Sequence, residues 1–123
     1  MELHQYQSIM NKPLISIKHL SVDYITDSKP IQAVKKVSFK IIKGEIFGIV
    51  GESGSGKSTI VQAMMRILPP PAVISNGFIK INGKDILSLS SQDILDMRWN
   101  EISIVMQSAL NALNPVLSIR DQI

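Results

Sequence analysis

One short stretch carries the clearest chemistry in this chain. Residues 51–59 read GESGSGKST, which matches the pattern glycine, any four residues, glycine, lysine and then serine or threonine. The pattern is typical of a loop whose backbone N–H groups surround the phosphates of a nucleotide. A flexible Gly/Ser linker is the alternative interpretation, but the apolar run GEIFGIV precedes the loop and an apolar helical pattern follows it. The sequence therefore predicts a phosphate-binding site.

The residue types in this loop fit that chemistry. Glycine carries no Cβ, so the backbone can turn its N–H groups toward one anion. Lys57 is placed to reach the β- and γ-phosphates, and the Ser58 hydroxyl is placed to ligate Mg²⁺. A helix beginning at Lys57 would add the positive end of its dipole. The expected nucleotide contacts are Gly51, Glu52, Ser53, Gly54, Ser55, Gly56, Lys57, Ser58 and Thr59.

A buried strand and an amphipathic helix are expected to hold the loop. The run EIFGIVG, after Gly44, is nearly continuous in apolar residues, as in a strand covered on both faces of a parallel sheet. Residues 57–68 place apolar side chains at helical spacing, which predicts a helix that packs on that sheet. Three prolines, 69 to 71, would end it.

Two antiparallel strands are expected ahead of the loop. Apolar and polar residues alternate from Leu14 to Ile25, with a break in phase near His19 that indicates a bulge. A turn at residues 26–30 leads to IQAVKKVSFKI, the second strand. Its lysines, with Lys43 just beyond it, are interpreted as a solvated face rather than a polyanion site; they are Lys35, Lys36 and Lys40.

Shorter elements are expected after the prolines. Two Asn-Gly turn signals, 76–77 and 82–83, enclose FIKI as a short strand. Ser90 or Ser91 is expected to cap a helix that runs to about Trp99, whose ring we interpret as local packing. The run ISIVM then predicts a second buried strand. Near the C-terminus, serine 118 and aspartate 121 resemble a capping box that opens a helix.

The overall composition excludes several functional classes. The 123 residues are 45% hydrophobic, enough for one domain with a core. A net charge of +3 is too small and dispersed to indicate a nucleic-acid interface. The chain has no cysteine and only two histidines, His4 and His19, so it offers no disulfide framework and no zinc cluster. No apolar run is long enough to span a membrane.

Two residues outside the loop are candidate parts of the same site. Gln107 follows ISIVM, and ligands of parallel sheets lie at the carboxyl ends of strands. Its amide could contact Mg²⁺ or a water near the γ-phosphate, or it could simply end a strand. Tyr24 could stack on a nucleobase, or it could be a packing residue of its strand.

The order of Tyr24, GESGSGKST and IVMQ resembles the nucleotide-binding domain of ATP-binding cassette (ABC) transporters. In that family an aromatic A-loop residue stacks on adenine, the phosphate loop is called Walker A, and the glutamine belongs to the Q-loop. The resemblance implies that Tyr24 contacts adenine, that residues 51–59 bind the phosphates and Mg²⁺, and that Gln107 senses the γ-phosphate and ligates the metal. Lys57 and Gln107 are then the expected catalytic residues, and ATP and Mg²⁺ are the expected cofactors.

Finer features are similar to one branch, the dipeptide, oligopeptide and nickel importers. They are LPPP at residues 68–71, GKDILSLS at 83–90, Met-Arg at 97–98 with Glu-Ile at 101–102, and ALNP at 112–115. One departure is Ser108-Ala109, where the family usually has an acidic residue and proline after the glutamine. This departure bears on the transported solute more than on ATP.

The resemblance implies an α/β fold: half of a P-loop NTPase (RecA-like) core with an ABC-type antiparallel β subdomain, as an incomplete domain. Residues 1–13 are expected to be a flexible lead-in, and 14–123 the N-terminal half of the domain. Within it we expect the antiparallel portion at about 14–44, the Walker A strand, loop and helix at about 45–68, a β hairpin region at about 77–86, and the Q-loop strand and loop at about 102–117.

The implied role is the ATP-binding subunit of an importer at the cytoplasmic face of the cell membrane. Its implied partners are transmembrane permease subunits, a second ABC ATPase subunit and, indirectly, a solute-binding protein, with no nucleic acid. The 123 residues contain no LSGGQ signature and no apolar strand that ends in Asp-Glu. We therefore expect a fragment that binds nucleotide without hydrolysing it at the family's rate. The alternatives are a structural or dimerisation fragment, or another P-loop NTPase.

Overall fold

A computed structural model describes residues 12–106 and 113–122 of the chain. Two long strands come first and a short helix follows them, as the sequence predicts. The elements in chain order are β1 (Pro13–Tyr24), β2 (Ile31–Ile42), α2 (Lys57–Met64), β3 (Ala72–Ile81), β4 (Lys84–Asp85), α3 (Ser91–Met97) and the 3₁₀ turn η2 (Ile119–Asp121). No helix within these described ranges has the length and apolar character that a membrane span requires.

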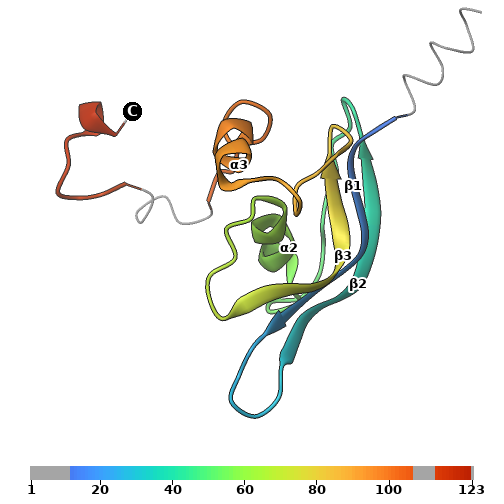
Figure 1. The fold of residues 1–123 in the computed structure, drawn as a ribbon. Coiled ribbons are helices and arrows are strands. Elements are labelled where there is room, and N and C mark those ends of the chain that lie inside the picture. The colour runs from blue at the N-terminus through green and yellow to red at the C-terminus, as the bar shows by residue number, and fades with distance from the viewer. Residues whose placement is uncertain (1–11, 107–112, 123) are drawn as a thin grey trace, which may run out of the picture.

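The strands form one antiparallel sheet, in the order β2-β1-β3-β4 (Figure 1). The predicted pairing of the first two strands is confirmed, with Ile17 opposite Phe39 and Leu20 opposite Val37. β1 also pairs with β3, so it is the central strand of the long part of the sheet. The lysines of β2 are exposed, as expected for a solvated face.

The predicted bulge near His19 is present, and it explains one wrong prediction. His19 has a φ of 51° and donates its N–H to Ser38 Oγ at 2.8 Å. Gly77 lies against it: a Cβ at this glycine would be 2.6 Å from the His19 carbonyl oxygen. Asn76-Gly77 is therefore not a turn but a close approach inside β3. Asn82-Gly83 does form the turn between β3 and β4.

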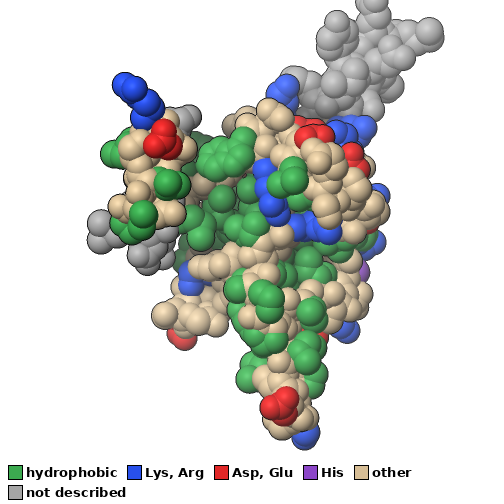
Figure 2. Space-filling view, turned by 60° about the vertical axis from the view of Figure 1, so that its left-hand side comes forward, with side chains coloured by type: hydrophobic (Ala, Val, Ile, Leu, Met, Phe, Trp, Pro, Cys, Tyr) green, Lys and Arg blue, Asp and Glu red, His purple; other side chains and the backbone are tan. Residues whose placement is uncertain are grey.

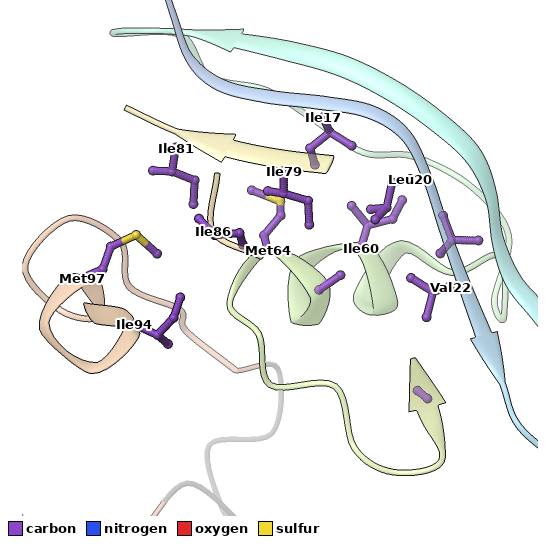
Figure 3. Close-up of a cluster of buried hydrophobic side chains, with 13 residues drawn as sticks. Ile17, Leu20, Val22, Ile60, Met64, Ile79, Ile81, Ile86, Ile94 and Met97 are labelled. Carbon is purple, nitrogen blue, oxygen red and sulfur yellow. The ribbon is translucent and has the colours of Figure 1, made fainter. Parts of the chain in front are cut away.

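The core lies between one face of the sheet and the two helices (Figure 3). Alternate residues of β1 and β3 point inward, and α2 and α3 cover them with their apolar faces. Ile60 and Met64 of α2 are buried, which fixes the helix that follows the phosphate loop. The other buried members include Ile17, Leu20, Val22, Ile79, Ile81, Ile86, Ile94 and Met97.

The two predicted parallel strands are not formed. Residues 45–50 have no strand, Ile46 is 100% exposed and Val50 is 95% exposed. Residues 102–106 make only a single bridge, between Arg98 and Ile102, and Val105 is 96% exposed. A buried parallel strand requires hydrogen-bonding neighbours and cover on both faces. The strands β1 to β4 pair only antiparallel with one another, and neither apolar run joins their sheet among the described residues.

These apolar side chains add to the hydrophobic surface of the molecule. Figure 2 shows hydrophobic side chains open on the face that comes forward from the left of Figure 1. Trp99 is 79% exposed, so its predicted packing role is wrong. The large exposed hydrophobic residues with it include Leu95, Met106, Leu113, Val116, Leu117 and Ile119.

Both helices are as predicted in type, with one difference in length. α2 ends at Met64, four residues before the predicted Leu68, because the backbone turns left-handed at Arg66. α3 begins after Ser90, whose hydroxyl accepts the Asp93 N–H at 3.2 Å while Asp93 accepts the Ser90 N–H at 3.3 Å. This reciprocal capping box fixes the start of the helix.

Candidate nucleotide-binding site

The phosphate loop is shaped by turns and continues into the first turn of α2. Gly56 caps this helix with a φ of 87° and accepts the Ile60 N–H at 3.0 Å through its carbonyl oxygen. A Cβ on Gly56 would lie 2.5 Å from the Ala33 carbonyl oxygen of β2. Only glycine combines this backbone conformation with this close approach. The loop is therefore packed against the antiparallel sheet at Gly56.

Lys57 folds back over the loop. Its Nζ donates to the Gly51 carbonyl oxygen at 2.8 Å, to the Glu52 carbonyl oxygen, and to Ser55 Oγ at 3.2 Å. The loop also closes on itself, since the Ser55 N–H donates to the Glu52 carbonyl oxygen at 3.2 Å. The ammonium charge therefore sits inside the curve of the loop.

One cavity joins this loop to Tyr24. It has a volume of about 270 Å³, and its lining residues are Tyr24, Ala33, Gly54, Ser55, Gly56, Lys57, Ser58 and Thr59. Tyr24 ends β1 opposite Ile31 of β2 and Ala72 of β3, so the sheet determines its position. The cavity combines an aromatic ring, an ammonium group, hydroxyls and a helix N-terminus, which is the chemistry that a nucleoside phosphate requires.

The other predicted site residues fall into two groups. Gly51, Glu52 and Ser53 lie in the exposed part of the loop and do not line the cavity. Gln107 lies outside the described residues. Ser58 is exposed in the first turn of α2, whereas Thr59 is buried. The predicted residues that do meet in the cavity come from segments about 30 positions apart, Tyr24 and the loop.

Ala33 is a cavity residue that the sequence reasoning missed. It is a small, half-buried residue near the start of β2, and its carbonyl oxygen faces Gly56. A small residue between Gln32 and Val34 gives no recognisable signal in the sequence alone. The register of β1 and β2 is what brings it beside Tyr24.

The shifted pKa values belong to groups away from this cavity. Hydrogen bonds from Lys84 and then Asn82 lower the pKa of Glu101, and the same Glu101 contact raises the pKa of Lys84. The Ser90 hydroxyl and backbone lower the pKa of Asp93. No group of three or more His, Cys, Asp or Glu side chains suited to a metal occurs among residues 12–106 and 113–122.

The chain is similar to known proteins of one family. Residues 34–122 match the family profile described as ABC transporter. The dipeptide transport ATP-binding protein DppD of Bacillus subtilis is 41% identical over 111 residues, which cover 89% of this chain and 33% of that protein. The oligopeptide transport ATP-binding protein OppD of the same organism is 39% identical, over 89% of this chain and 31% of its own length. The chain thus spans about one third of the length of these relatives.

A solved structure is also similar. A bacterial Atm1-family ABC exporter with ATP bound has a TM-score of 0.55 and 26% identity, over 72% of this chain and 14% of the exporter chain. The predicted fold class and the predicted resemblance to peptide importers are both confirmed. On its sequence match and its fold, this chain belongs to the ABC transporter family.

Proposed function

We propose that this chain binds ATP as part of the ATPase subunit of a peptide importer. The observation that carries the proposal is that Tyr24 and the loop residues from Gly54 to Thr59 line the same cavity. An aromatic ring and a phosphate loop in one cavity suit the two ends of ATP. The names of the relatives, dipeptide and oligopeptide transport ATP-binding proteins, support a peptide as the transported solute, ahead of nickel.

The proposed contacts follow from the types of the cavity residues. Tyr24 stacks on the adenine, and the loop from Gly51 to Thr59 surrounds the phosphates with its N–H groups. Lys57 exchanges its carbonyl partners for β- and γ-phosphate oxygens, and the Ser58 hydroxyl ligates Mg²⁺. Gln107 is proposed to sense the γ-phosphate and its metal.

Binding, rather than hydrolysis, is the activity that we propose for these residues. When bound, ATP supplies the transferable γ-phosphoryl group, and its transfer depends on positioning and on charge stabilisation. Lys57 and the α2 N-terminus supply positive charge. No apolar strand ending in Asp-Glu occurs in the 123 residues, so we propose nucleotide binding alone for them.

The proposed setting is the cytoplasmic face of the cell membrane. There the subunit would contact transmembrane permeases and a second ATPase subunit, and through the permeases it would serve a solute-binding protein. Coupling of ATP to peptide uptake is therefore a proposal about the assembled transporter. A chimera in which this chain replaces the matched third of DppD tests it: restored dipeptide uptake supports the proposal, and nickel uptake alone contradicts the peptide assignment.

The binding proposal has its own test in the chain itself. A fluorescent ATP analogue is titrated with and without Mg²⁺ into the wild type, Ser58→Ala and the control Ser28→Ala, which lies in an exposed turn. We expect Mg²⁺ to tighten binding in the wild type and the control, and this gain to fall about tenfold in Ser58→Ala, as for loss of a charge-assisted contact. An equal Mg²⁺ effect in all three proteins contradicts the proposed metal ligand.

A further inference from the structure

The C-terminal end of α2 contains an unusual residue choice. The Arg66 N–H donates to the Ala63 carbonyl oxygen at 3.1 Å, and the Ile67 N–H donates to that of Gln62 at 2.9 Å. These two bonds define a Schellman motif, whose left-handed position is normally glycine. Arg66 occupies that position with a φ of 51°. A side chain there costs about 1 kcal/mol of backbone strain, and the arginine side chain makes contacts that glycine lacks.

That contribution is a pair of hydrogen bonds to a distant part of the chain. Arg66 Nη1 donates to the Ile86 carbonyl oxygen at 3.1 Å and to the Leu89 carbonyl oxygen at 2.8 Å. Both acceptors lie in the segment between β4 and α3. The end of the phosphate-loop helix is therefore tied to the residues that lead into α3.

A second arginine makes the reverse connection. Arg98, at the end of α3, donates through Nε and Nη2 to the Met65 carbonyl oxygen at 3.2 and 2.9 Å, and through Nη2 to the Arg66 carbonyl oxygen at 3.0 Å. Carbonyls at a helix C-terminus lack intrahelical partners, and a planar guanidinium can satisfy two of them at once. Each arginine thus bonds to the backbone of the other's segment. We call Arg66 and Arg98, with the further acceptor residues Met65, Ile86 and Leu89, the arginine clasp.

The residue after Arg98 is also strained. Trp99 has a φ of 68°, rare for a bulky side chain, and its N–H donates to the Ile102 carbonyl oxygen at 2.7 Å. Arg98 and Ile102 form the bridge noted above, so residues 98–102 make a tight turn. Strained residues persist only where surrounding contacts hold them. Here the clasp holds one end of the turn, and the other end continues into residues 103–106.

We propose that Arg98 and Arg66 are positioning residues for the nucleotide site. The clasp fixes the start of segment 99–106 to the C-terminal end of α2, whose N-terminal end forms the phosphate site. Movement of α2 on nucleotide binding is thereby transmitted to Trp99 and the segment that follows it. The inference rests on the proposed ATP-binding function, but neither arginine touches the nucleotide cavity.

Trp99 provides the readout, because it is the only tryptophan in the chain. Its emission is followed during titration with MgATP, while binding is measured separately by calorimetry. Arg66→Gly suits the left-handed backbone but lacks the guanidinium. Arg66→Ala lacks the guanidinium and also strains the left-handed backbone. Arg98→Lys keeps the positive charge but loses the planar set of donors that reaches two carbonyl oxygens. Arg120→Gln removes one positive charge from η2 as the matched control.

We expect MgATP to change Trp99 emission in the wild type and in Arg120→Gln. In Arg66→Gly and Arg98→Lys this change in emission should be largely lost, because the guanidinium contacts that tie segment 99–106 to α2 are missing, while ATP affinity stays near that of the wild type. Full wild-type emission changes in those two variants overturn the proposal. The proposal is also overturned if the size of the emission change correlates with the thermal stability of the variants rather than with the presence of the guanidinium.

The experiment also separates this inference from the proposed function. If calorimetry detects no ATP binding by the wild type, the proposed function fails. Acrylamide quenching of Trp99 without nucleotide then still tests the clasp: altered quenching in Arg66→Gly and Arg98→Lys supports it, and unchanged quenching overturns it. If ATP binds but wild-type Trp99 emission does not respond, the proposed positioning role of the clasp is wrong and the proposed function stands.

Discussion

Lys57 Nζ lies 2.8 Å from the carbonyl oxygen of Gly51, six residues earlier at the start of the phosphate loop. The lysine side chain therefore holds the loop closed by bonding to backbone carbonyl oxygens of the loop. A phosphate that enters the cavity must compete for the same ammonium, so binding exchanges carbonyl partners for charged ones. A phosphate oxygen is the stronger partner, because it carries negative charge that attracts the ammonium, whereas a carbonyl oxygen is neutral.

The first prediction compares two loop glycines that differ in their surroundings. Gly54 and Gly56 both have positive φ, but a Cβ on Gly54 meets open space, whereas one on Gly56 lies 2.5 Å from the Ala33 carbonyl oxygen. We expect Gly54→Ala to lower the free energy of unfolding by about 1 kcal/mol through backbone strain, and Gly56→Ala to lower it by more. Urea unfolding measures both. Equal losses would mean that the loop does not pack against β2 at Ala33.

A second prediction concerns Tyr24 and the base. Tyr24→Ala should weaken ATP binding by about tenfold, since stacking on an aromatic ring contributes roughly 1–3 kcal/mol, while Tyr24→Phe keeps most of the affinity. Inorganic tripolyphosphate serves as the control ligand, because it has the phosphates without the base. Its affinity should be the same in all three proteins. If Tyr24→Ala weakens ATP and tripolyphosphate equally, the ring acts on the loop rather than on adenine.

The third prediction concerns the ion pair between Lys84 and Glu101, whose Nζ and Oε1 are 2.8 Å apart. Hydrogen bonding by Lys84 lowers the pKa of Glu101 below 4.5, so the stabilisation is present above that pH and is lost as pH falls through the lowered pKa. We expect Glu101→Gln to lower the urea midpoint slightly at neutral pH, with the difference closing in acid. Asp27→Asn, in an exposed turn, controls for loss of one carboxylate. A difference independent of pH would rule out the charge as its source.

Local signals in the sequence predicted much of this molecule. The alternation in β1 and β2, the bulge at His19 and the Ser90 cap depend on nearby residues, and the structure has all three. The residues of the loop pattern from Gly54 to Thr59 line one cavity with Tyr24, and their nucleotide contacts stay predictions. The domain boundaries and the role of Gln107 stay predictions.

Contacts between residues far apart in the sequence could not be predicted from such local signals. Apolar runs at 45–50 and 102–106 indicated strands, but a strand also needs partners along its edges, which an apolar run does not specify. The sequence did not indicate the left-handed residue at the end of α2, because that position is normally glycine and here it is Arg66. Ala33 reaches the cavity only through strand register.

The most direct test of the account is a calorimetric titration of MgATP into the wild type, Lys57→Ala and the control Lys35→Ala, whose lysine is exposed on β2. A hydrogen bond to a charged group contributes about 1.5–3 kcal/mol to the free energy of an interaction, and Lys57→Ala removes such bonds. The account predicts saturable binding by the wild type and Lys35→Ala, and at least about tenfold weaker binding by Lys57→Ala at similar stability. Equal affinity in all three proteins, or no binding by the wild type, would contradict it.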